Sequence, residues 1–210
     1  MDDMKTLFER HPHTVVLTCT LKGERVANEV ALKARFGRRR PLVTLPGDVK
    51  QNPENYNEAG VFRADRKPMP AEIPIYCGMK VVLTQNIRKE ADFVNGQDCE
   101  VEDFDDNDTG GALRVMTATG QRLAIFRWTD TEHMGANYFP IRVGYASTIH
   151  KAQGGEFPHV SVWLDAKFMP AAAYTALSRV AESSAFLLAG KLKRHHFVPA
   201  SFTHPSQYKG

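Results

Sequence analysis

The sequence predicts an α/β domain built on a parallel sheet, with a small antiparallel β-structure inserted into it. Three observations lead to this fold class. An apolar, β-branched segment at 13–20 runs into a helical pattern, which is the opening unit of an α/β domain. Short strand-like segments with tight turns occupy 79–128, and a strand–helix–strand order returns between 160 and 189.

Length and composition are those of a globular chain. Its 210 residues, 42% of them hydrophobic and 24% charged, suffice for one ordinary domain plus a small one. A net charge of +3 does not by itself indicate a nucleic-acid partner. Cys19, Cys77 and Cys99 are far apart and form no CxxC pair, which argues against a disulfide framework or a zinc site. With no apolar leader and no apolar run near about 18 residues, we expect an intracellular protein without a membrane span.

The first predicted unit is a strand followed by a helix. The strand is 13–20, and the helix extends from Glu24 to Phe36. Its helical spacing comes from valines and alanines at every third or fourth position. Gly37 is the expected helix stop, because glycine adopts a left-handed conformation at no steric cost.

The middle of the chain changes from an irregular stretch to a series of strands. Residues 47–74 are rich in Pro, Asn and Gly, and no regular structure is predicted there. Asn95-Gly96 is a hairpin turn signal, and a second turn is expected around Gly120. The expected strands are 79–84, 99–104, 112–116 and 121–128. Together they predict a small antiparallel barrel or meander.

The last third returns to the α/β pattern. The apolar strand 160–165 ends in Asp165 without a second acidic residue beside it, so we interpret it as a core strand. Pro170 is expected to open a helix, since its missing N–H costs nothing there, and the alanine-rich run supports a helix to about Val180. A final strand is expected at 186–189.

The segment 145–157 carries the densest group of polar side chains between two apolar elements. Ser147, Thr148 and Lys151 offer groups that bind phosphate, and Gly154 and Gly155 allow backbone to approach a ligand closely. The alternative is a polar turn between two strands. Composition alone favours neither.

Two segments resemble motifs of one helicase family. Thr148-Ile149-His150-Lys151-Ala152-Gln153-Gly154 resembles motif V of superfamily 1 helicases of the RecD-like and Pif-type branch. Tyr174-Thr175-Ala176-Leu177-Ser178-Arg179-Val180 resembles motif VI. The strand and helix with Asn28 loosely resemble motif IV, and Gly78 to Gly96 resembles the SH3-like insertion, with Cys99 where the family usually has a second glycine.

The resemblance implies the C-terminal half of such a motor. The implied fold is a RecA-like parallel sheet, the second motor domain, with an inserted SH3-like β-barrel. The implied domains are 13–46 and 139–190 for the RecA-like domain, 75–138 for the insertion and 191–210 for a basic tail.

The resemblance also implies roles for single residues. Arg179 would be the catalytic arginine finger that binds the γ-phosphate, whereas the alternative is a cation at a helix C-terminus, worth about 0.3–1 kcal/mol. Gln153, Gly154 and Glu156 would bind nucleotide. The DNA-binding residues would be Thr148, His150 and Lys151.

The implied cofactors are ATP and Mg²⁺, bound mainly by an N-terminal RecA-like domain that is missing from this chain. The sequence contains no GxxxxGK[ST] loop and no Asp-Glu pair after an apolar run. We therefore expect that this chain alone binds neither ATP nor Mg²⁺. No metal site is predicted, because a calcium loop read from Asp105 has Met116 where its last ligand should be. The expected partners are single-stranded DNA, ATP and the missing domain, with no membrane.

The implied function is ATP-dependent DNA unwinding, although this chain by itself is expected to be inactive. Two alternatives remain open at this stage. The chain could be a single-stranded nucleic-acid-binding module without a motor, or an inactive truncated product.

Overall fold

The computed structural model describes residues 2–88, 90, 93–106, 110–166, 171–180, 182 and 184–189. They divide into two compact units. Unit 1 is Arg25–Ala146, and unit 2 combines Asp2–Glu24 with the described residues from Ser147 onward. The predicted tail at 191–210 and the predicted helix start at Pro170 lie outside the described residues.

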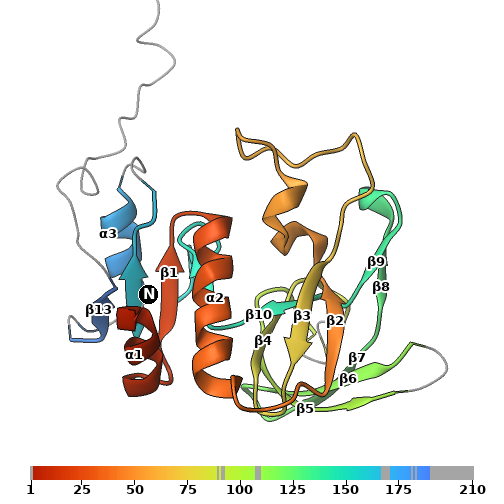
Figure 1. The fold of residues 1–210 in the computed structure, drawn as a ribbon, viewed down its shortest axis with the longest axis horizontal. Coiled ribbons are helices and arrows are strands. Elements are labelled where there is room, and N and C mark those ends of the chain that lie inside the picture. The colour runs from red at the N-terminus through yellow and green to blue at the C-terminus, as the bar shows by residue number, and fades with distance from the viewer. Residues whose placement is uncertain are drawn as a thin grey trace, which may run out of the picture. The chain divides into compact units, whose positions relative to one another are not determined.

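A parallel sheet organises unit 2, which confirms the predicted α/β class. Its strands, in the order β11-β1-β12-β13, are Ala146–Thr148, Val15–Thr18, Val160–Trp163 and Phe186–Leu188. The inner strands β1 and β12 run parallel to each other, with Val15 opposite Val160, and β12 runs parallel to β13 (Figure 1). Strands buried on both faces are near-continuous apolar runs, and β1 and β12 fit that description.

The core of unit 2 joins this sheet to the segment that follows β11. Its fully buried members are Leu17, Ile149, Ala152, Val160, Val162, Ala172 and Ala176. Burying a Leu, Ile or Val side chain contributes about 1.5–3 kcal/mol. Because Ile149 and Ala152 belong to the predicted motif V segment, core packing anchors that segment to the sheet.

Two helices belong wholly to unit 2. The helix α1 (Asp2–Arg10) was not predicted, and it buries Met4 and Phe8, one turn apart. The helix α3 (Ala172–Leu177) is shorter than predicted and ends before Arg179. The guanidinium of Arg179 donates from Nε to the carbonyl of Thr175 at 3.1 Å, so it caps the last turn from outside the helix.

The helix α2 (Leu21–Phe36) begins three residues earlier than its pattern predicted. Thr20 is the reason, because its hydroxyl accepts the N–H of Gly23 at 2.9 Å in the manner of an N-cap. The helix ends at Phe36 as predicted, but Gly37 does not have a positive φ. A Cβ on Gly37 would instead overlap the carbonyl of Lys33, so close backbone approach explains the glycine.

Unit 1 contains a five-stranded antiparallel sheet in the order β10-β4-β5-β6-β7. Its strands are Ile141–Val143, Lys80–Leu83, Asp98–Asp105, Ala112–Thr117 and Arg122–Ile125. Gly96, with φ +91°, and Gly120, with φ +84°, lie in the two turns that the sequence predicted. The strand expected at 121–128 is wrong in its second half, because Trp128 belongs to a different sheet.

Two smaller antiparallel pairs complete unit 1. One pair consists of β8 (Trp128–Asp130) and β9 (Ala136–Tyr138). The other consists of β2 (Val43–Gly47) and β3 (Ala71–Ile75). Between β2 and β3 lie two short 3₁₀ helices, Val49–Gln51 and Pro53–Asn55.

The stretch at 47–74 therefore has more structure than predicted. The buried amide of Asn55 donates to the carbonyls of Val49 and Met69 and accepts the N–H of Met69. These side-chain bonds hold the chain without any periodic apolar pattern, which is why the sequence did not reveal them. None of the described helices has the length and apolar character needed to cross a membrane.

Candidate functional site

The segment after β11 folds into a compact loop, 149–157, in unit 2. The N–H of Ile149 donates to the carbonyl of Thr18 at 2.8 Å, which ties the loop to the end of β1. Further along, the N–H of Ala152 donates to Thr148 at 3.0 Å and that of Gly155 to Ala152 at 3.1 Å. Gly154 has φ +81°, a conformation that favours glycine.

The side chains of this loop differ in their burial. Ile149 and Ala152 are buried in the core, whereas His150, Gln153 and Glu156 are exposed. The predicted DNA-binding residue His150 and the predicted nucleotide-binding residues Gln153, Gly154 and Glu156 thus occupy one exposed loop.

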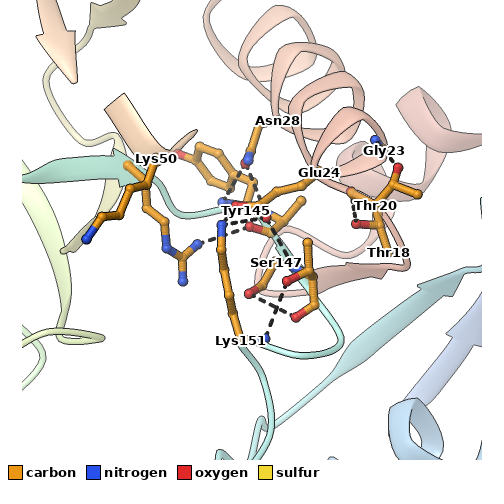
Figure 2. Close-up of polar contacts among 12 residues, drawn as sticks. Thr18, Thr20, Gly23, Glu24, Asn28, Lys50, Tyr145, Ser147 and Lys151 are labelled. Atoms are coloured by element: carbon orange, nitrogen blue, oxygen red, sulfur yellow. Dashed lines mark hydrogen bonds and ion pairs between the residues drawn. The ribbon is translucent and has the colours of Figure 1, made fainter. Parts of the chain in front are cut away.

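Lys151 bonds to a carboxylate that the sequence analysis did not single out. Its Nζ lies 3.0 and 3.2 Å from the two carboxylate oxygens of Glu24, in the first turn of α2. Figure 2 shows the two side chains pointing toward each other. The Glu24 side chain is 6% exposed and that of Lys151 is 30% exposed, so the carboxylate is shielded from water while the lysine stays partly exposed.

Thr148 lies beside the same carboxylate and is 6% exposed. Its N–H donates to Oε2 of Glu24 at 3.2 Å, and its hydroxyl accepts the N–H of Lys151 at 3.4 Å. The Thr148 side chain therefore bonds within the loop. Of the three predicted DNA-binding residues, Thr148 and Lys151 bond to Glu24. His150 is exposed and is not bonded to that carboxylate.

Arg179 connects the segment resembling motif VI to the same loop. The N–H of Phe157 donates to the carbonyl of Arg179 at 2.9 Å, and Nη1 of Arg179 donates to the carbonyl of Gly155 at 3.4 Å. Nη2 donates to the hydroxyl of Ser178 at 3.0 Å. Within the described part of the chain, no carboxylate lies within ion-pair distance of this guanidinium.

Asp165 holds the loop between β1 and α2. Its Oδ1 accepts the N–H of Cys19 at 2.7 Å and that of Thr20 at 3.2 Å, and its Oδ2 accepts the hydroxyl of Thr20. The core strand expected at 160–165 is observed as Val160–Trp163, so Asp165 lies beyond its end, and the prediction missed these bonds. The missed signal is a carboxylate two residues after an apolar strand, at the sheet edge where neighbouring parallel strands end together.

Asn28, like Asp165, accepts two backbone N–H groups with its side chain, here in unit 1. Its Oδ1 accepts the N–H of Tyr145 at 3.1 Å and that of Ala146 at 2.9 Å. The Tyr145 ring lies under the guanidinium of Arg35, 4.8 Å from ring centroid to Cζ. Asn28 therefore supports the chain just before the predicted motif V residues.

One other cluster in unit 1 has metal-ligand chemistry. Ligand atoms of Asp130, Glu132 and His133 lie within 4.8 Å of one another. The Asp130 carboxylate, however, already accepts the hydroxyl of Tyr138 at 2.7 Å, Nδ1 of His133 at 2.9 Å and two backbone N–H groups. These bonds explain the cluster as the cap of a short 3₁₀ helix.

Comparison with known proteins gives a consistent set of similar chains. No family model matches the sequence. The chain is 26% identical over 145 residues to the ATP-dependent DNA helicase PIF1 of Mus musculus, and 28% identical over 122 residues to that of Danio rerio. These matches cover 66% and 54% of this chain, but only 22% and 19% of the helicases. The chain thus spans about a fifth of the length of the curated relatives it matches.

Solved structures resemble the fold over most of the chain. The Pif1 helicase of Candida albicans has a TM-score of 0.64 at 20% identity, with 96% of this chain and 52% of that chain covered. The Bacteroides Pif1 helicase in complex with ADP-AlF3 and ssDNA has a TM-score of 0.64 at 17% identity, with 89% and 42% covered. At such identities the likeness establishes the fold.

Proposed function

Because the chain is homologous to Pif1 helicases of superfamily 1 over about two thirds of its length, we propose that it is the C-terminal motor portion of an ATP-dependent DNA helicase. In this proposal, unit 2 carries the RecA-like sheet of the second motor domain. Four strands of the antiparallel sheet of unit 1, β4 to β7, belong to an SH3-like insertion at 75–138. The RecA-like domain is made of 13–46 and 139–190.

The observation that carries the proposal is the position of Arg179. Its guanidinium lies on the exposed loop that bears Gln153, Gly154 and Glu156, and no described carboxylate neutralises it. A planar cation without a counter-charge is suited to an anion such as a nucleotide phosphate.

Only part of an ATP site is supported by these residues. They fit contacts to the outer phosphate and the nucleotide edge, but the chain offers no glycine-rich loop and no strand-end Asp-Glu pair. We therefore propose that ATP and Mg²⁺ are held mainly by a first RecA-like domain outside this chain. ATP would supply the free energy of unwinding, and Arg179 would bind the γ-phosphate as an arginine finger.

Single-stranded DNA is the proposed second ligand of unit 2. His150 is exposed near the start of the loop, and Thr148 and Lys151 lie before and after it in the same turn. Because one loop would face both nucleotide and DNA, closure on ATP could alter the grip on DNA. A motor-less module that binds single-stranded nucleic acid is the second candidate, favoured by the missing glycine-rich loop.

Binding of a fluorescent single-stranded oligo(dT) to the purified chain tests the proposal. We expect binding at low salt that weakens as salt rises, since phosphate contacts release counterions. His150→Ala should weaken binding, whereas replacing His13, an exposed histidine in the connection before β1, should not. Absence of binding at low salt would reject the DNA-binding role, and ATP hydrolysis by the chain alone would reject the need for a further domain.

A further inference from the structure

The buried carboxylate of Glu24 has no role in the function proposed above. This carboxylate bonds to both ends of the turn that presents His150, the proposed DNA contact: it accepts the N–H of Thr148 once and Nζ of Lys151 with both oxygens. We propose that Glu24 is a positioning residue for single-stranded DNA binding, which shapes this turn and withholds the charge of Lys151 from the DNA phosphates. This inference rests on the proposed DNA-binding function.

The first step is geometric. Residues 148 and 151 lie at the two ends of one turn, and the Glu24 carboxylate bonds to both ends. The hydroxyl of Thr148 also accepts the N–H of Lys151 at 3.4 Å, so the turn is held by side chain and backbone together. His150, between these ends, is the exposed side chain that the turn presents to solvent.

The second step is electrostatic. A carboxylate that is only 6% exposed needs a bonded counter-charge, because an unpaired charge in such a place is strongly unfavourable. Lys151 supplies that charge at 3.0 Å. If its ammonium moved to a phosphate, both charge-assisted bonds to the Glu24 carboxylate, at 3.0 and 3.2 Å, would break. Lys151 is therefore expected to stay with Glu24 when DNA binds, and to release no counterion from the DNA.

The salt dependence of binding distinguishes this role from a direct phosphate contact. Each lysine that neutralises a phosphate of a single strand adds about 0.7 to the slope of log K against log salt. A lysine that stays paired with Glu24 adds nothing. Removing the charge of Glu24, while keeping an oxygen that accepts the Thr148 N–H, should release Lys151 toward the DNA.

The experiment measures oligo(dT) affinity at four or more salt concentrations for the wild type, Glu24→Gln, Lys151→Met and the double variant. We expect Glu24→Gln to bind more tightly at low salt, with a slope steeper by about 0.7. Lys151→Met should leave the wild-type slope unchanged, and in the Glu24→Gln background it should remove the added slope. Lys151→Arg keeps the ion pair and should keep the wild-type slope and affinity.

The matched controls are Glu9→Gln and Lys5→Met, which break an exposed Lys–Glu pair on α1, with 52% and 60% of those side chains exposed. Hydrogen exchange of the Thr148 amide checks the turn itself. Its protection should survive Glu24→Gln and be lost in Glu24→Ala.

The outcomes separate the two proposals. If Lys151→Met lowers the wild-type slope by about 0.7 and Glu24→Gln leaves it unchanged, Lys151 is a direct phosphate contact and this inference is wrong. If the wild type binds no oligo(dT), the proposed function fails, and the inference fails with it. A Thr148 amide that exchanges equally in wild type and Glu24→Ala also overturns the positioning role, whether or not DNA binds.

Discussion

The side chain of Arg179 reaches back 24 residues to the loop after β11, where its Nη1 donates to the carbonyl of Gly155 at 3.4 Å. Two sequence motifs that are separate in the chain are thus joined in unit 2. This bond is long, and a phosphate oxygen would be a stronger, charge-assisted acceptor than a backbone carbonyl. The Arg179 guanidinium is therefore placed to exchange a weak partner for a strong one.

In a longer protein that also carries a glycine-rich phosphate loop, Arg179→Ala should abolish most ATP hydrolysis. The expected loss is about 10³-fold or more, the range found for arginine fingers, with ATP binding largely retained. Steady-state hydrolysis and nucleotide titration measure the two effects separately. Arg122→Ala, which removes a 78%-exposed arginine in unit 1, is the control and should change neither. Unchanged turnover in Arg179→Ala would reject the finger role.

Gly23→Ala should destabilise the protein although it lies inside α2. Alanine normally stabilises a helix over glycine by about 0.5–1 kcal/mol. Here the added Cβ would overlap the carboxylate of Asp165 and displace it from the N–H groups of Cys19 and Thr20. Leaving such groups unsatisfied costs about 1–3 kcal/mol each. Urea unfolding measures the change in the free energy of unfolding.

A double variant shows whether the contact with Asp165 is the cause. Once Asp165→Ala has removed the carboxylate, adding Gly23→Ala should cost less than it does in the wild type. A stabilising Gly23→Ala would contradict the expected overlap.

The three cysteines should differ in their rates of alkylation. Burial, together with the nearby Asp98, raises the pKa of Cys99 to about 12, so almost no thiolate forms at pH 8. Burial also raises the pKa of Cys19, whereas Cys77 is exposed. Iodoacetamide at pH 8 should therefore modify Cys77 first, and Cys99 only after unfolding in urea. Peptide mass spectrometry measures this order, and rapid modification of Cys99 in the native protein would be evidence against it.

Acid should destabilise unit 2 through His159. Its ring stacks on His11 at 5.2 Å between centroids, and its Nδ1 shares a hydrogen bond with the hydroxyl of Thr14. Burial, with the charge of His11 second, lowers the pKa of His159 below its ordinary value of 6.5. The unfolded chain therefore binds more protons just below pH 6.5, and the free energy of unfolding falls as the pH drops through the lowered pKa.

Urea unfolding between pH 8 and pH 5 measures this dependence. In the variant His159→Gln, the part of the slope that comes from His159 should disappear. The same fall in stability with and without His159 would show that another group is responsible.

Local patterns were enough to predict much of the fold. Alternation and apolar runs indicated β1, β4, β6 and β12, and glycine turns indicated where neighbouring strands reverse. These features depend on residues close together in sequence. The helix α1 and the pair β2–β3 were missed, because a short amphipathic helix and side-chain-bonded turns leave little periodic signal.

The candidate site was predicted unevenly for the same reason. His150 and Arg179 were singled out from contiguous motifs, and their roles remain proposals. Glu24 was treated only as the start of a helix, although it contacts a residue 127 positions away. No short-range pattern specifies such a partner, because the contact exists only once folding has brought Glu24 and the loop after β11 together.

The sequence by itself determined an α/β class with a parallel sheet, an antiparallel insertion and the two polar motifs. These features depend on residues that are close together in the sequence, because the spacing of apolar and turn residues favours particular strands, turns and helices. Only the tertiary structure decided that Lys151 is paired while Arg179 has no carboxylate beside it among the described residues. The counter-charge of a side chain depends on which distant segment the core packs next to it, and burial then determines whether that charge must stay paired.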